Sequence, residues 1–160
     1  MKRHAIIHLI FLLFTTSAYA KCEAGSKTIF SCITQKGKQI EVCDAGKTII
    51  YSFGNPKAKP EIVIANPRNK VSTYQWQGVG RYIHYSVEIT KGNTTYSVFH
   101  AVDKHKGNTT DGHPVDKLAE EHGIEAGVNV TINDKLVATV KCTEKSIINN
   151  IEGVDLKPTE

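Results

Sequence analysis

The chain has 160 residues, with 20 Lys and Arg against 16 Asp and Glu and a formal net charge of +4. Without Lys2 and Arg3, which belong to the N-terminal segment considered next, 18 basic residues face 16 acidic ones. This near balance lacks the basic surplus that a nucleic-acid-binding or membrane-surface protein needs, and the length suits one domain.

Residues 1–20 have the features of a secretory signal peptide. Basic residues at positions 2 and 3 precede an apolar run over 6–14, and Ala18-Tyr19-Ala20 is a small-residue cleavage site. The run is too short for a membrane anchor, and Lys21 stands where a lipoprotein would need Cys. We therefore expect cleavage after Ala20 and a periplasmic or secreted protein with no membrane anchor.

The first part of the mature chain predicts four strands. Turn residues separate short runs of alternating apolar and polar character. The segment 54–60 is a predicted loop because its two prolines remove backbone donors and fix φ. The predicted strands cover residues 28–34, 39–43, 47–53 and 61–65, and the first two form a hairpin with a three-residue loop at 36–38.

The stretch from Val71 to Val102 carries the strongest strand signal. Apolar residues at positions 83, 85, 87 and 89 alternate with polar ones, and Gly92-Asn93 suits a two-residue hairpin turn. With that dipeptide at the tip, nearly every apolar side chain of both strands shares one face. The predicted pairs are Ile89–Tyr96, Val87–Val98, Tyr85–His100 and Ile83–Val102.

The last third of the chain predicts one short helix and one more hairpin. Residues 114–122 form the helix, since Pro suits a first helical turn and Gly123 would end it. Residues 127–142 form the hairpin, with a three-residue loop at 133–135 that pairs Ile132 with Leu136. The polar residues 143–160 are predicted to be a loose tail with at most one helical turn.

These elements together predict an all-β fold. About eight short strands separated by regular turn signals, with one short helix, are typical of a single antiparallel β-barrel or sandwich. We expect this domain to span residues 21–142.

Four cysteines in an exported chain allow three disulfide pairings, which strand parity distinguishes. Cys32 shares a face with Phe30 and should lie opposite Val42, which turns Cys43 to the other face. Cys142 continues the apolar face of the last hairpin. We therefore predict the bridges Cys32–Cys142 and Cys22–Cys43.

The chain contains no common catalytic motif. Gly-x-Ser-x-Gly and His-Glu-x-x-His are absent, and Gly78-Val79-Gly80 precedes a strand, whereas a phosphate-binding loop precedes a helix. We predict that the protein is not an enzyme.

A group of histidines and aspartates suggests a zinc or copper site, but their spacing fits no standard ligand pattern. His100 should in addition face inward, opposite Tyr85. We expect no metal and no other cofactor, and a histidine-based metal-binding protein is the least favoured function. The residues are His100, His105, His113, His122, Asp103, Asp111 and Asp116.

The segment before the central hairpin is the best candidate for binding a protein partner. Trp, Tyr and Arg are the residue types that dominate interface energies, and two glycines let the backbone bulge outward. Arg81 would be the charged anchor, because its planar fork suits acidic groups. The alternative is that Trp76 belongs to the core. The predicted contact residues are Gln75, Trp76, Gln77, Arg81 and Tyr82.

Several short motifs resemble the bacterial periplasmic and membrane-bound inhibitors of C-type lysozyme. They are Phe30-Ser31-Cys32, the Gly-x-Gly-Arg-Tyr turn at 78–82 and the strand ending at Cys142. The resemblance covers roughly residues 28–142 and implies a small β-barrel in which two loops enter the lysozyme cleft. Arg81-Tyr82 and Lys91-Gly92 match those loops, which adds Lys91 to the predicted contacts. Gln77-Gly78-Val79 replaces the family's serines.

The combined reading is an exported binding module that inhibits a cell-wall-degrading enzyme. Its partner would be a muramidase or a similar hydrolase, and the protein would act as a lysozyme inhibitor or as the immunity protein of a delivered toxin. The alternative is a structural or adhesive surface β protein. The sequence does not indicate an oligomeric state.

Overall fold

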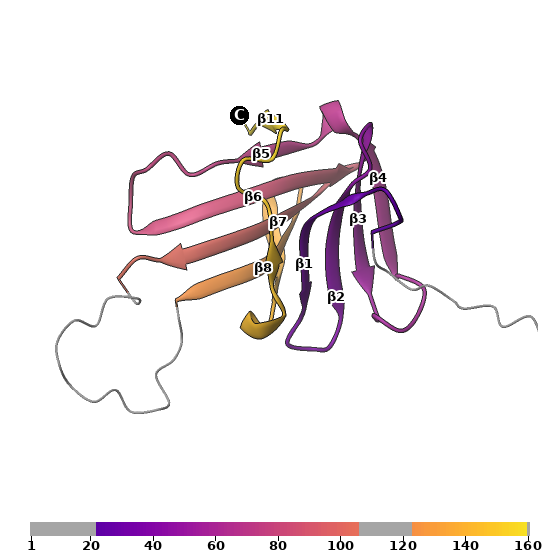
Figure 1. Cartoon of the computed structure of the whole chain (residues 1–160), viewed down its shortest axis with the longest axis horizontal. Helices are drawn as coiled ribbons and strands as arrows, with labels where there is room; N and C mark the ends of the chain where they lie inside the picture. Colours follow the sequence, from indigo (N-terminus) through magenta and orange to yellow (C-terminus); the bar gives the residue numbers. More distant parts are fainter. Residues whose placement is uncertain (1–21, 106–122, 160) are drawn as a thin grey trace, which may run out of the picture.

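Two β-sheets pack face to face in the part of the chain that the computed structural model describes, residues 22–105 and 123–159. Strands of one sheet run across those of the other, as Figure 1 shows for β1–β4 and β5–β8. The all-β prediction is therefore confirmed, and the fold is a sandwich of the crossed type. Within these residues no helix is long and apolar enough to cross a membrane.

The first sheet has the order β10-β1-β2-β3-β4 and is antiparallel throughout. The second has the order β11-β5-β6-β7-β8-β9 and is antiparallel except for the β11–β5 pair. The strands are β1 (Lys27–Ile33), β2 (Gln39–Asp44), β3 (Thr48–Gly54), β4 (Ile62–Pro67), β5 (Ser72–Tyr74), β6 (Tyr82–Lys91), β7 (Thr94–Asp103), β8 (Ile124–Ile132), β9 (Lys135–Lys141), β10 (Ile148–Asn149) and β11 (Lys157–Pro158), with 3-10 turns η1 (Arg68–Lys70) and η2 (Glu144–Ser146).

The central hairpin, β6–β7, has the predicted register. All four predicted pairs form, from Ile89–Tyr96 to Ile83–Val102, and Lys91 pairs with Thr94 across the turn. Gly92 has a φ of 63°. This left-handed conformation at the first turn position is the one that a type II′ hairpin turn needs from glycine.

The first hairpin, β1–β2, is shifted from the predicted register. Cys32 pairs with Ile40, not with Val42, because residues 34–38 form a longer loop, in which the Thr34 nitrogen donates to the Lys38 carbonyl at 2.7 Å. From Phe30 to Ile33 the shift amounts to two residues, so these side chains keep their predicted faces, whereas a bulge between Thr28 and Phe30 changes the register at the start of β1.

The last hairpin, β8–β9, has a two-residue loop, and the predicted three-residue loop is wrong. Asn133 and Asp134 have φ values of 47° and 62°, the type I′ combination, so Ile132 pairs with Lys135. A bulge after Val130 absorbs the extra residue, so Val130 still pairs with Ala138 and Val128 with Val140, as a three-residue loop at 133–135 would also have placed them.

Gly127 lies very close to the backbone of β9. A Cβ atom at this position would lie 2.1 Å from the Val140 carbonyl oxygen. The backbones can approach this closely only because residue 127 has no side chain.

Both predicted disulfides are confirmed. Cys22–Cys43 spans 5.5 Å between Cα atoms, and Cys32–Cys142 spans 5.9 Å. The second bridge joins the sheets where Cys142, just beyond β9, pairs with Thr34. It therefore fixes one corner of the sandwich.

The C-terminal segment 143–160 is polar, but the prediction that it is loose is wrong for its described residues. β10 pairs with β1 in the first sheet, and β11 pairs with β5 in the second. Between them Ile151 is fully buried in the core. This segment, which Figure 1 draws in yellow, therefore contributes a strand to each sheet.

The core lies between the inner faces of the sheets, where apolar side chains of both alternate with outward-facing ones. Its fully buried apolar side chains are Phe30, Ile40, Val42, Ile49, Tyr51, Val71, Val87, Ile89, Val98, Val128 and Ile151. The predicted signal peptide, the predicted helix at 114–122, His113, His122, Asp111 and Asp116 lie outside the described residues.

Candidate functional site

The segment from Gln75 to Tyr82, called here the 75–82 loop, connects β5 to β6 and is held in shape by its own side chains. Trp76 Nε1 donates to the Val79 carbonyl at 2.9 Å, and Gln77 Nε2 donates to the Gln75 carbonyl at 2.7 Å. Left-handed glycines flank Val79, with φ values of 84° and 94°. The loop thus presents Val79, 82% exposed, at its tip.

The side-chain amide of Gln75 makes hydrogen bonds within the fold. Its Nε2 donates to the Ile151 carbonyl at 3.0 Å and to Thr73 Oγ1 at 2.8 Å, while its Oε1 accepts from the Gly153 nitrogen at 2.9 Å. The amide group therefore holds the C-terminal segment against β5. The prediction of Gln75 as a contact residue has no support in this geometry.

Trp76 packs partly against the core, as the alternative interpretation proposed. Its ring contacts the buried cluster. The Lys104 ammonium lies 5.0 Å from the ring centroid, a cation–π arrangement. Trp76 therefore packs between the loop and the core, and part of its surface stays accessible.

Arg81 is bound to an internal carboxylate. Its Nε donates to Asp103 Oδ1 at 2.8 Å and its Nη2 to Oδ2 at 2.5 Å, and Asp103 is only 4% exposed. The hydrogen bond from Arg81 lowers the pKa of Asp103 to about 2, and a bond from the His105 nitrogen adds to this against the opposing effect of desolvation. This ion pair occupies Nε and Nη2, while 52% of the Arg81 side chain is exposed, and its role as the charged anchor for a partner stays a prediction.

Three predicted contact residues of this loop are exposed, namely Gln77, Arg81 and Tyr82. Tyr82 is 50% exposed, and the Arg81 guanidinium carbon lies 5.4 Å from its ring centroid. Val79 is also accessible, but it was not among the predicted contact residues, because Gly78-Val79-Gly80 was considered only as a possible phosphate-binding loop. The sequence feature that could have indicated Val79 as a contact residue is an apolar side chain between two glycines just before a strand.

Lys91 does not belong to the same surface. It ends β6, whereas Tyr82 begins it. Nine residue steps along an extended strand separate the two by roughly 30 Å. The two loops that the lysozyme-inhibitor resemblance would place in one cleft therefore lie at opposite ends of the central hairpin.

A charged groove of about 420 Å³ begins beside the 75–82 loop. It runs past the ends of β7, β8 and β9, and its charges alternate in sign: Arg81 with Asp103, then Glu125 with Lys141 at 3.5 Å. The lining residues are Gln35, Arg81, Tyr82, Asp103, Gly123, Ile124, Glu125, Ala126, Lys141, Cys142, Thr143, Glu144 and Ile147.

The described histidines near this region do not assemble a metal site. His100 faces inward opposite Tyr85 as predicted, its Nδ1 is buried without a partner, and burial lowers its pKa. His105 is exposed. No group of three close ligand atoms includes either histidine within residues 22–105 and 123–159.

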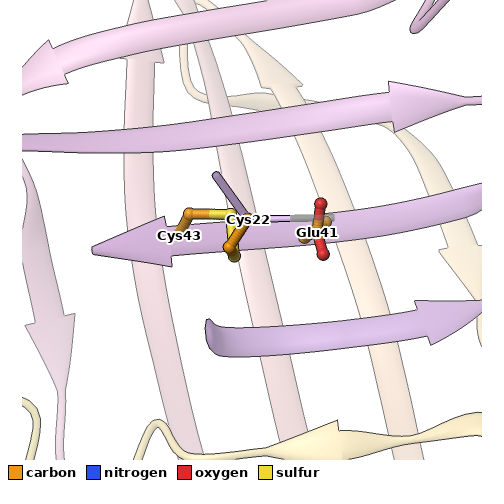
Figure 2. Close-up of side chains that lie close together, drawn as sticks. All are labelled: Cys22, Glu41 and Cys43. Atoms are coloured by element: carbon orange, nitrogen blue, oxygen red, sulfur yellow. A yellow bond between two sulfur atoms is a disulfide. The ribbon is translucent and has the colours of Figure 1, made fainter. Parts of the chain in front are cut away.

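One such group exists elsewhere in the described residues, formed by Cys22, Glu41 and Cys43 (Figure 2). The two sulfur atoms are bonded to each other, so neither is the thiolate that a metal requires. The group therefore holds no metal while the bridge is intact.

Comparisons of the chain with protein-family models, with curated proteins and with solved structures find no match.

Proposed function

We propose that this protein is an exported binding module that inhibits a cell-wall-degrading enzyme, and that Val79 at the tip of the 75–82 loop inserts into the partner. The main support for this proposal is that the Val79 side chain is apolar and 82% exposed, on a loop closed by internal hydrogen bonds. An exposed hydrophobic residue on a fixed loop is suited to bury itself in a complementary pocket.

The rigidity of the loop favours binding. Its side-chain hydrogen bonds and the packing of Trp76 beneath it fix the backbone before contact. Little conformational entropy is then lost when a partner binds. Tyr82 adds an aromatic anchor next to the tip, and the alternating charges of the groove provide a polar rim.

The surface chemistry and the predicted export support the proposed class of partner. Two disulfides support an oxidising compartment. Asp103 takes Nε and Nη2 of Arg81, which leaves Nη1 for a carboxylate of the partner. Glycosidase clefts contain a pair of catalytic carboxylates, so a muramidase fits both the tip and this donor.

The test measures inhibition of a C-type lysozyme acting on bacterial cell walls, together with the Kd by calorimetry. Val79→Asp and Tyr82→Ala are each expected to weaken binding by about 30-fold or more, the equivalent of a hot spot. Val63→Asp is the matched control, because Val63 is a half-exposed valine on β4 in the other sheet.

Three outcomes would refute the proposal. The first is that the wild-type protein neither binds nor inhibits lysozyme or a second muramidase. The second is that the Val79 and Tyr82 variants bind as tightly as the wild type. The third is that the Val63 control loses binding to the same extent as the Val79 variant, which would place the effect outside the loop.

A further inference from the structure

A row of aromatic rings crosses the outer face of the second sheet. Tyr74 of β5 lies 5.6 Å from His84 of β6, and His84 lies 6.3 Å from Phe99 of β7, measured between ring centroids. Tyr82 lies two residues before His84 on β6 and therefore on the same face. Tyr74 is 42% exposed and Tyr82 is 50% exposed.

The strand register places this row on the side away from the core. Tyr74 pairs with Ser86, and Ser86 pairs with Phe99. The residues on either side of Ser86, Tyr85 and Val87, belong to the core cluster, whereas Phe99 does not. Phe99 is buried and stacks on His84 at an interplanar angle of 20°. The imidazole is thereby held between Phe99 and the exposed Tyr74.

A fixed carboxylate lies next to the row. Glu88 follows on the same face of β6, and its Oε1 accepts hydrogen bonds from Ser86 Oγ at 2.8 Å and from Ser97 Oγ at 2.7 Å. These two bonds set the orientation of the carboxyl group. No described side chain donates to Oε2, which remains able to accept from a ligand.

We propose that this outer face, formed by Tyr74, Tyr82, His84 and Glu88, binds a β-linked oligosaccharide. The flat C–H faces of such sugars stack on aromatic rings, whose faces are electron-rich. Their hydroxyl groups donate to a carboxylate such as that of Glu88. Burial lowers the pKa of His84, with partial opposition from Glu88, so the imidazole is neutral at pH 7 and offers both a donor and an acceptor.

The polar chemistry of the face favours an oligosaccharide over other ligands that stack on aromatic rings. The carboxylate of Glu88, which two serine hydroxyls hold on this face, repels the phosphates of a single-stranded nucleic acid. A proline-rich peptide stacks on such rings too. However, proline has no N–H group, so such a peptide supplies few donors for the Glu88 carboxylate.

The experiment titrates the protein with a soluble tetramer of β-1,4-linked N-acetylglucosamine, with no lysozyme present. Saturable binding is expected with a Kd of about 1 mM or tighter. Tyr74→Ala and Glu88→Gln should each weaken it by about tenfold, and Tyr74→Phe should retain it. The Val63→Ala control should bind as the wild type does, and thermal unfolding of each variant verifies folding.

Several results would overturn the inference. They are the absence of saturable binding, unchanged affinity in both the Tyr74→Ala and Glu88→Gln variants, or binding of a proline decamer in place of the sugar. Val79→Asp distinguishes this site from the proposed protein-binding loop. It should weaken lysozyme binding by about 30-fold or more and leave sugar binding unchanged, so either proposal can fail without the other.

Discussion

The guanidinium of Arg81 and the carboxylate of Asp103 meet across the open end of the β6–β7 hairpin, joined by two hydrogen bonds of 2.8 and 2.5 Å. One residue comes from the 75–82 loop and the other from the last position of β7. The pair therefore fixes the base of the loop to the sheet. The strength of this attachment depends on the ionisation of Asp103.

Acid should weaken the fold partly through Asp103. Its pKa is lowered from an ordinary 3.8 to about 2, so the folded state favours the ionised form. This contribution to stability is complete above pH of about 4 and is lost as the pH falls towards about 2. Melting temperatures between pH 5 and pH 2 should fall less steeply for Asp103→Asn than for the wild type. Parallel curves would contradict the assignment.

Replacement of Arg81 should reduce thermal stability as well as any binding. Arg81→Ala leaves the buried Asp103 carboxylate without its counter-ion, which is costlier than the loss of an exposed charge. The melting temperature at pH 7 should fall, and adding Asp103→Ala should recover part of the loss. Two single variants whose effects simply add in the double variant would show that the residues are uncoupled.

The two disulfides should contribute unequally to stability. Cys32–Cys142 spans 110 residues and Cys22–Cys43 spans 21. In the chain-entropy model these loops correspond to about 5 and about 3 kcal/mol. Urea unfolding of the Cys32→Ala/Cys142→Ala and Cys22→Ala/Cys43→Ala double variants measures the difference. A larger loss from the shorter bridge would show that effects other than loop entropy dominate.

Ile151→Ala should destabilise the protein by about 2–5 kcal/mol, because a fully buried aliphatic side chain would leave a cavity. Equilibrium urea unfolding gives this value. Ile148→Ala is the control, because Ile148 is a β10 residue that is largely exposed. A similar small loss in both variants would mean that the C-terminal segment contributes little to the core.

Gly127→Ala should destabilise the fold by more than about 2 kcal/mol, since its Cβ would overlap the Val140 carbonyl and push β9 away. Gly92→Ala is the comparison. That position has open space around it and a left-handed backbone, which costs an alanine about 1–2 kcal/mol. Thermal and urea unfolding of both variants test the order, and the reverse order would contradict it.

Elements whose sequence pattern lies within a few neighbouring residues could be predicted. The β6–β7 register followed from a two-residue period and one turn dipeptide. The Cys32–Cys142 pairing survived a wrong loop length because a shift of two residues preserves side-chain parity. The same register, extended by one pair, places Tyr82 opposite Asp103. The contact between Arg81 and Asp103 was therefore within reach of the sequence.

The C-terminal segment could not be predicted in this way. Ile147, Ile148, Ile151 and Val154 recur at intervals of three or four residues, which indicates a helical turn and does not predict a strand in each sheet. The burial of Ile151 depends on a space that exists only after both sheets have packed. The separation of Lys91 from Tyr82 was missed for a different reason, since the family resemblance placed both loops in one cleft without considering the length of the strand between them.

The order of the cysteines along the chain has a consequence for maturation. Cys22 and Cys43 enclose Cys32, whose partner follows 110 residues later, so the native bridges interleave. A chain delivered N-terminus first presents Cys22 and Cys32 to an oxidant before either partner has emerged. A bond between these two neighbours is non-native and must be undone by thiol–disulfide exchange. Production of the correctly bridged protein should therefore depend on a disulfide isomerase, and the long bridge can close only after synthesis has passed Cys142.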